Sequence, residues 1–343
     1  MSQTKHLLPQ VEKYFRTNLH THTNLTDGVP SPEEMKKIYK DKGYSILSIT
    51  DHNILMDFSE LNDEDFLMLN GVEYNINEEG WATNRLRTKT YHLNFIAKDP
   101  DNLWMPFLPG APKDVARPYV EKCIDGGYPR VYDIDVINKI IEEANQRGFL
   151  VMYNHPTWSL QSYPDYAPLK GLWATEIANG DSARGGSGDR DNSRVFADLM
   201  NLGNNIFPVG ADDAHGPGSA GLAWIMLGAE KLDYRHAITA LEKGDFYAST
   251  GPEIYELSLT DNKLHIRCSD AQFVTLESGT RYYKRKNPIA PDKFIREATF
   301  DISKWLEDCY GESPREWLRI VVHGPYGQMA TSRAYHLDEL KQA

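Results

Sequence analysis

Short apolar runs alternate with helix-like stretches between about residues 16 and 250. Runs of this length are typical of strands, and we place the first four at 17–20, 44–50, 66–74 and 91–97. The later predicted strands are FLVMYNHP (149–156), GLWATEIAN (171–179), NIFPVGADDAH (205–215) and LAWIML (222–227). Alternation of strands with helices favours an α/β fold with a parallel sheet, and we expect a barrel.

Helix signals fill several of the gaps between these strands. The segment 31–43 has Ser31 and Glu34 in the positions of a capping box, Pro32 in the first turn and Gly43 as a stop. The segment 133–148 carries one apolar stripe, which consists of Ile134, Ile137, Ile140, Ile141 and Ala144. Further helices are predicted near 191–203 and 233–243. The Pro-rich segment 98–130 and the Gly-rich segment 183–190 are predicted as loops.

The character of the chain changes after Gly251. Short strand-like runs now follow one another with turn residues between them and little helical spacing; they are EIYELSLTD, KLHIRCS, QFVTLESG, ATFDIS and WLRIVVHG. This pattern is typical of a small antiparallel β-sandwich. We therefore predict two domains, a barrel over 1–250 with an insertion at about 98–130, and a β-sandwich over 251–343.

Acidic residues outnumber basic ones by 49 to 37, which gives a formal net charge of -12. Affinity for nucleic-acid polymers rests on basic surface, so such polymers are not expected partners. The three cysteines show neither the spacing of a disulfide framework nor that of a thiolate metal site. The N-terminus has no apolar core of signal-peptide length, and no run is long enough to span a membrane, so we expect a cytoplasmic protein without a membrane partner. An exported protein whose signal peptide has been removed is the alternative. The oligomeric state is left open.

Side chains of metal-binding type cluster at the ends of the predicted strands. Residues i and i+2 of a strand point to the same face, so His20 and His22 can bind one metal ion together, and Asp213 and His215 repeat this spacing. Loops at the carboxyl ends of barrel strands meet at one rim, where these residues should converge. Others of the same type near strand ends are His52, Glu73, His92, His155 and Glu176. Imidazole and carboxylate ligands together suit Zn, Mn or Fe.

The segments NLHTHTNLTDG, ITDHN, GVEYN, YHL, YNHP and GADDAH occur in this order between residues 16 and 250. As an ordered set they resemble the polymerase and histidinol phosphatase (PHP) superfamily. The resemblance implies a distorted (β/α)7 TIM-like barrel, two or three divalent metal ions, and hydrolysis of phosphate esters. The segments TGPEIYELSL and LRIVVHGPYGQMATSRAYHL resemble, more weakly, a β-domain that follows some bacterial PHP barrels.

The resemblance also implies how the ligands are shared among three metal positions. They are His20, His22, Glu73 and Asp213 for the first ion, Glu73, His92 and His155 for the second, and Asp27, His52 and His215 for the third. The first set would also hold the reacting water. Asp51 and Asp212 could themselves be ligands, but we expect them to orient ligand rings, as carboxylates beside metal-binding histidines commonly do. Glu176 fits a site role and a structural role equally well.

Arginines are the natural contacts for a phosphate group, because the guanidinium binds two oxyanion oxygens at once. Arg184 and Arg190 in the Gly-rich loop are the first candidates, and Arg85 and Arg87 come next. A solvated loop charge is the simpler explanation for the first two. The histidines that match no motif are assigned no function; they are His6, His236, His265, His323 and His336.

The leading hypothesis is a metal-dependent phosphoesterase, a hydrolase of class EC 3.1, that acts on a small phosphorylated metabolite or nucleotide through a metal-activated hydroxide. Three alternatives stay open at this point. The chain could be a protein-tyrosine phosphatase, a metallohydrolase of a non-phosphate bond, or a non-catalytic module in which metal ions only stabilise the fold. A degenerate barrel tends to lose ligands, and the complete set speaks against the last alternative.

Overall fold

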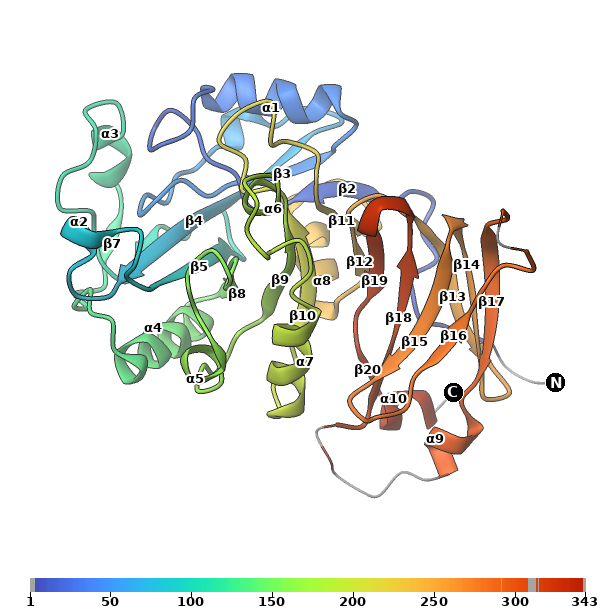
Figure 1. Cartoon of the computed structure of the whole chain (residues 1–343). Coiled ribbons are helices and arrows are strands. Elements are labelled where there is room, and N and C mark those ends of the chain that lie inside the picture. Colours follow the sequence, from blue (N-terminus) through green and yellow to red (C-terminus); the bar gives the residue numbers. More distant parts are fainter. Residues whose placement is uncertain (1–3, 291, 308–312, 314, 342–343) are drawn as a thin grey trace.

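A computed structural model describes residues 4–290, 292–307, 313 and 315–341 of the chain (Figure 1). One sheet runs through both halves of the molecule, and its main path has the order β10-β9-β8-β5-β4-β3-β2-β11-β12-β19-β18-β15-β16. The strands of the first half are β2 (Phe15–Asn18), β3 (Ile46–Ile49), β4 (Leu67–Asn77), β5 (Thr90–Ala97), β8 (Phe149–Tyr153), β9 (Ala174–Asn179), β10 (Phe207–Ala211), β11 (Trp224–Leu227) and β12 (Phe246–Ser249). Each predicted strand of this half is present.

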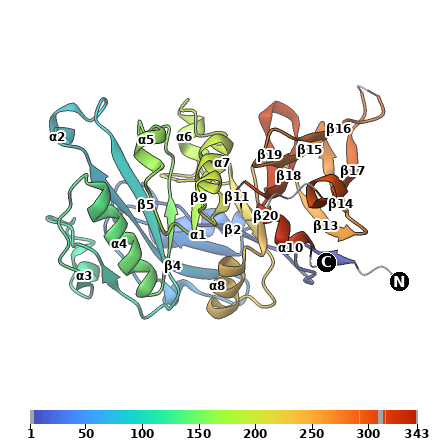
Figure 2. The same ribbon diagram turned by 90° about the horizontal axis from the view of Figure 1, so that it is seen from below.

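The helices form where the local signals predict them. Ser31 Oγ accepts from the backbone N–H of Glu34, and the Glu34 carboxylate accepts from the backbone N–H of Ser31, so the capping box that begins α1 is confirmed. The apolar stripe of α4 is buried apart from its first residue, Ile134. The bounds are α1 (Pro32–Asp41), α2 (Trp81–Asn84), α3 (Arg117–Val120), α4 (Ile134–Gln146), α5 (Tyr163–Tyr166), α6 (Gly180–Arg184), α7 (Ser193–Asn201), α8 (Tyr234–Lys243), α9 (Ser303–Glu307) and α10 (Leu337–Lys341). Figure 2 shows α4 and α8 beside the central strands.

Two segments that the sequence predicts as loops carry short elements. The segment 98–130 contains β6 (Trp104–Met105), α3 and β7 (Ile124–Asp125), and β6 pairs with β7. Trp104 and Phe107 of this segment are buried in the main apolar core. The start of 183–190 belongs to α6. The insertion is therefore packed onto the body of the protein rather than extended from it.

The direction of β5 departs from the all-parallel expectation. β5 pairs antiparallel with β4 and with β8, whereas β2, β3 and β4, and likewise β8, β9 and β10, pair in parallel. The physical reason is the connection, because residues 78–89 between β4 and β5 hold only the single turn α2 and provide no crossover helix. The start of β5 consequently lies beside the end of β4, which brings His92 opposite Asn75.

The closed barrel stays a prediction. The hydrogen-bonded series runs from β2 to β10, and between its two ends the described residues show a single bridge, Thr21 with Ala214. Two backbone hydrogen bonds accompany it, from the His22 N–H to the Ala214 carbonyl (3.0 Å) and from the Asp213 N–H to the His20 carbonyl (2.9 Å). This contact joins the two segments that carry the HxH and DxH motifs.

The second half consists of two antiparallel layers around a separate apolar core. One layer has the order β1-β13-β14-β17, and the other continues the long sheet through the pairing of β12 with β19. The bounds are β1 (Lys5–His6), β13 (Ile254–Thr260), β14 (Lys263–Ala271), β15 (Phe273–Ser278), β16 (Lys284–Lys286), β17 (Ile295–Asp301), β18 (Trp317–His323), β19 (Met329–Ser332) and β20 (Tyr335–His336). The N-terminal β1 thus pairs within this half. Among the described residues, no helix combines the length and apolarity that crossing a bilayer requires.

Candidate metal centre

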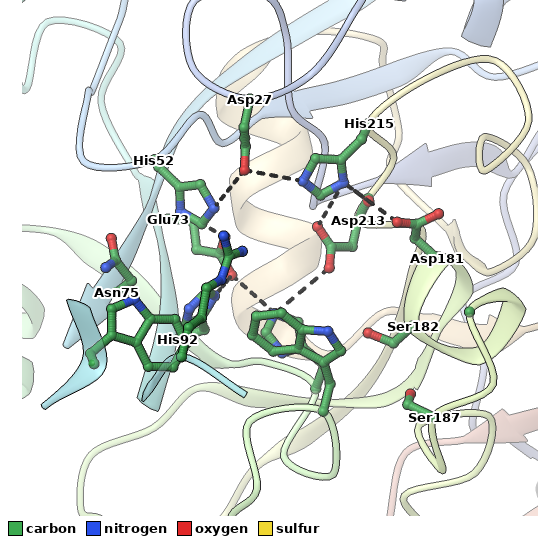
Figure 3. A pocket seen from close by; sticks show the side chains of 15 residues that line it. Asp27, His52, Glu73, Asn75, His92, Asp181, Ser182, Ser187, Asp213 and His215 are labelled. Carbon is green, nitrogen blue, oxygen red and sulfur yellow. Dashed lines mark hydrogen bonds and ion pairs between the residues drawn. The ribbon is translucent and has the colours of Figure 1, made fainter. Parts of the chain in front are cut away.

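The predicted ligands lie together at one end of the strands of the first half. Figure 3 shows those that line the cavity, among them Asp27, Glu73 and Asp213. His20 and His22 follow β2, His52 follows β3, and His155 follows β8. Glu73 lies on β4 and His92 near the start of β5, and Asp213 and His215 follow β10. The sequence predicts His20 and His22 on the first strand; β2 instead ends at Asn18, and the Thr21 bridge holds this segment. The two Nε2 atoms still lie 3.2 Å apart, as the i, i+2 spacing predicts.

Glu73 occupies the middle of the cluster and is buried. Its carboxylate lies within 3.3 Å of a ring nitrogen of five histidines, which are His20, His22, His52, His92 and His155. Oε1 faces His20, His92 and His155, and Oε2 faces His22 and His52. The two oxygens thus face different groups of imidazoles, as expected for a carboxylate that belongs to both of the first two predicted ligand groups.

Asp213 completes the first predicted group. Its Oδ1 lies 3.0 Å from His22 Nε2 and 3.3 Å from His20 Nε2. The backbone of Asp213 has a φ of 54°, which a residue with a side chain adopts uncommonly. The hydrogen bond from its N–H to the His20 carbonyl holds it in that conformation. Ligand atoms of His20, His22, Glu73 and Asp213 all lie within 4.8 Å of one another.

The third predicted group also comes together, on the more exposed side of the cluster. Asp27 Oδ2 lies 3.4 Å from His52 Nε2 and 3.5 Å from His215 Nε2. His215 Nδ1 hydrogen bonds with the backbone carbonyl of Asp213 (2.9 Å) and lies 3.6 Å from the carboxylate of Asp181. Figure 3 shows Asp27 between His52 and His215, with Asp181 on the other side of His215. The Nδ1 contact leaves Nε2 as the ligand atom.

The electrostatics of the cluster call for positive charge. Burial opposes protonation of His22, yet hydrogen bonds with Asp213 and Glu73 outweigh it and raise the pKa of His22 to about 9. Burial likewise opposes protonation of His155, while Glu73 and Asp213 raise the pKa of His155 to about 9. Burial dominates at His92 and lowers its pKa to about 4. Divalent ions would supply the missing positive charge without protons on these rings.

The donor set also passes a direct test of fit. His22 Nδ1 and His52 Nδ1 are buried and make no hydrogen bond of acceptable geometry, although carboxylate oxygens lie 3.5 Å and 3.2 Å away. A buried ring nitrogen without a partner is costly in a protein interior. Imidazole nitrogens and carboxylate oxygens are also the ligands that Zn, Mn and Fe share. The residues present therefore fit divalent metal ions.

Glu176 has a specific place behind the ligands. Its Oε1 lies 2.6 Å from His20 Nδ1, on the ring edge opposite Nε2. Its Oε2 accepts from the backbone N–H of His155 (2.8 Å) and from the amide of Asn179 (2.9 Å). The carboxylate is fully buried. The sequence leaves open a site role and a structural role for Glu176. These contacts favour a role in which the carboxylate positions the His20 ring.

Asp51 and Asp212 hold loops, which differs from the predicted contact with ligand rings. Asp51 accepts from the N–H and hydroxyl of Thr23 (2.8 and 2.5 Å) and from the hydroxyl of Thr26 (2.5 Å). Asp212 accepts from three consecutive backbone N–H groups, those of residues 221–223, and from the Tyr39 hydroxyl. Asp51 thus fixes the loop that carries Asp27, and Asp212 fixes the loop that follows the DxH motif. Both carboxylates act on the ligands indirectly, through these loops.

A cavity of about 490 Å³ opens above the cluster. Of the four arginines predicted as phosphate contacts, Arg85 lines it; Arg87, Arg184 and Arg190 are exposed and lie outside its lining. Sequence reasoning missed the other residues of the wall, which are Asn75, Trp81, Trp158, Asp181, Ser182, Gly185 and Ser187. Spacing could have indicated Asn75, since it lies two residues after Glu73 on one strand.

Comparison with known proteins yields matches to solved structures. No family model matches the chain. No curated protein matches it either. A two-domain protein from Bacteroides vulgatus containing a predicted PHP-like metal-dependent phosphoesterase is 15% identical, with a TM-score of 0.44 over 86% of this chain and 98% of that one.

An amidohydrolase from Chromobacterium violaceum, with bound sulfate and no metal, is 14% identical, with a TM-score of 0.37 over 67% of this chain and 96% of that one. A lesion-specific endonuclease from Pyrococcus furiosus is 13% identical, with the same TM-score over 67% of this chain and 56% of that one.

Proposed function

We propose that this protein is a metal-dependent phosphoesterase of the PHP type that hydrolyses a small phosphate monoester. The observation that carries the proposal is the position of Glu73, whose single carboxylate faces five imidazoles from both of its oxygens. One carboxylate offers about four acceptor positions, so it cannot pair with five imidazoles through hydrogen bonds alone. If the carboxylate and the imidazoles instead bound two metal ions that the carboxylate bridges, every ring would have a partner. Two ions a few ångströms apart are the arrangement used for in-line displacement at phosphorus.

The charge of the cavity supports an anionic substrate. Among its described lining residues are four carboxylates, those of Asp27, Glu73, Asp181 and Asp213, against the one guanidinium of Arg85. With the histidines counted as neutral, the form in which imidazole binds a metal ion, these side chains carry three net negative charges, and two divalent ions would turn this into one positive charge. A phosphate ester carries negative charge and is attracted to such a wall. A neutral carbonyl substrate gains much less, which is why we prefer the phosphate reaction to other metal-assisted hydrolyses.

Divalent ions held by the three ligand groups would lower the pKa of a water toward neutrality and offset charge on the phosphate oxygens. The protein's own residues do the positioning. Glu176 keeps His20 with Nε2 toward the centre, and the Thr21 bridge keeps the HxH and DxH segments in register. Arg85 at the rim is placed to bind a phosphate oxygen or a charged leaving group.

The test is phosphate release from a panel of phosphomonoesters by protein loaded with Mn or Zn, with Asp213→Asn as the disabled variant. Asp213→Asn removes a charged ligand and should abolish turnover and lower the bound metal content. His265→Ala on β14 is the matched control, because this histidine lies in the second half and should leave both unchanged. Absence of turnover on every ester by fully loaded protein, or full activity of Asp213→Asn, would refute the proposal.

A further inference from the structure

Two tryptophans stand on the wall of the cavity, and metal binding gives neither of them a role. Trp158 follows the ligand His155 by three residues, and Trp81 begins α2 in the connection between β4 and β5. Both line the same cavity as Glu73 and Asp213. The Trp158 side chain is also among the exposed large apolar ones, at 39%. An indole held at the mouth of a charged site offers apolar surface that a ligand can cover.

A buried carboxylate holds the backbone at Trp158. Asp189 is fully buried, and its two oxygens accept from the backbone N–H groups of Thr157 (3.0 Å) and Trp158 (2.8 Å). The indole ring lies edge-to-face with His92 and His155, at centroid distances of 5.3 and 5.1 Å. The backbone at Trp158 is therefore held in place, and its ring lies beside His92 and His155, two of the predicted metal ligands.

Trp81 and Arg85 approach the cavity from the β4–β5 connection, residues 78–89. The Arg85 guanidinium lies 5.8 Å from the centre of the Trp81 ring. Leu86 in the same connection is 90% exposed and is not part of the lining, so this segment presents some side chains to the cavity and others to solvent. Figure 2 shows α2 standing at the end of β4 and β5, on the side where α5 and α6 also lie.

Polar groups occupy the rest of the wall. Figure 3 shows Asn75 and His92 on one side of the cavity and Ser182 and Ser187 on the other. The carbonyl oxygen of Asn75 accepts from the Asn53 amide (2.6 Å), which leaves the Asn75 amide N–H groups as donors. Indole rings with a few hydrogen-bonding groups are the combination that recognises a flat ring with polar edges.

We infer that this wall is a leaving-group subsite for a planar aromatic ring, so that the substrate is a phosphate ester of an aryl, benzylic or nucleoside type. The inference rests on the proposed function, because it takes the phosphate to lie over the metal ligands. A ring that stacks on Trp158 would lie next to His92 and His155, within reach of a phosphate at the centre. Trp81 and Arg85, which lie in the β4–β5 connection, would cover the ring from another side.

The experiment measures binding, so that it does not depend on turnover. Benzylphosphonate and cyclohexylmethylphosphonate carry the same non-hydrolysable anion and rings of equal carbon number, one flat and one puckered. Calorimetric titration of metal-loaded protein should give a dissociation constant about two- to tenfold lower for the flat ring, the range that an aromatic pair contributes beyond its buried area. Trp158→Ala should remove the difference, and Trp158→Phe should keep most of it.

Leu86→Ala is the matched control for the connection and should leave the ratio unchanged, while Trp81→Ala should reduce it. Equal affinities for the two phosphonates, or a ratio that survives in Trp158→Ala, would overturn the subsite. Circular dichroism and metal content of each variant verify that it is folded and loaded. The failure of the proposed function looks different: no hydrolysis of any phosphomonoester in the panel by fully loaded protein would refute the phosphoesterase, while the phosphonate ratio still decides the subsite.

Discussion

Replacing Glu176 by Gln tests how the buried carboxylate prepares His20 for metal binding. The side chain keeps its size, but it now has one acceptor oxygen and one amide. If the oxygen faces His20 Nδ1, the amide faces the His155 N–H and the Asn179 amide, and donors oppose donors. If the amide faces His20, the ring must accept at Nδ1 and carry its proton on Nε2, the nitrogen that faces Glu73 and Asp213.

Either orientation has a cost that can be estimated. The first leaves buried donors unpaired, at about 1–3 kcal/mol for each group. The second blocks the ligand nitrogen of His20. Loss of a carboxylate behind a metal-binding histidine commonly weakens metal affinity by about 10–100-fold, or about 1.4–2.8 kcal/mol. We expect the metal dissociation constant of Glu176→Gln to rise by this factor and the pH optimum of turnover to move.

The assay is competition for the metal with a chelator of known affinity, followed at several pH values. Glu142→Gln is the matched control, because Glu142 is an exposed residue of α4 and its replacement should leave the affinity unchanged. Thermal unfolding of metal-free protein separates a local defect from a loss of fold. Unchanged metal affinity in a folded Glu176→Gln protein would refute the positioning role.

Two further predictions concern the metal centre. The pKa values of His22 and His155 lie near 9 in the metal-free protein, so both rings carry protons at pH 7 and must release them when a metal ion binds. Metal affinity should therefore rise with pH up to about 9. Calorimetric titrations in buffers of different ionisation enthalpy should reveal the protons released on binding. pH-independent affinity between 6 and 9 would contradict this. Asp51→Asn should loosen the loop that carries Asp27 and reduce the number of tightly bound ions without loss of the His20 site, which metal analysis after dialysis would measure; unchanged stoichiometry would argue against the anchoring role.

The sequence was sufficient to predict the grouping of the ligands. A side chain at the carboxyl end of a parallel strand has its position set by the strand, and strands are visible as apolar runs, so His52, His155 and Asp213 could be placed at one rim. The capping box of α1 was equally readable, because all its interactions are local. The individual assignment of nine ligands to three ions depends on metals and stays a prediction.

Other features depend on contacts between distant parts of the chain. Glu176 and His20 are 156 positions apart, and the sequence does not show that one accepts from the other. The antiparallel direction of β5 follows from a short connection whose length was visible but whose path was not. Trp158 sits in an ordinary loop sequence, and its place on the cavity wall is set by Asp189 through two backbone N–H groups. Pairings of this kind require the folded structure.

The density of charge at the centre leads us to predict that bound metal ions stabilise the fold. Glu73 is 1% exposed, and the rings of His20 and His22 are fully buried, so without ions these groups must share protons in a desolvated space. Because the ions bind the folded state, a free metal concentration 100 times the dissociation constant should stabilise the protein by about 2.7 kcal/mol. Urea unfolding followed with and without a chelator measures this difference, and the apo protein should unfold at lower urea with a similar slope. Superimposable curves would mean that the cluster is stable without ions, and the argument from buried charge would then fail.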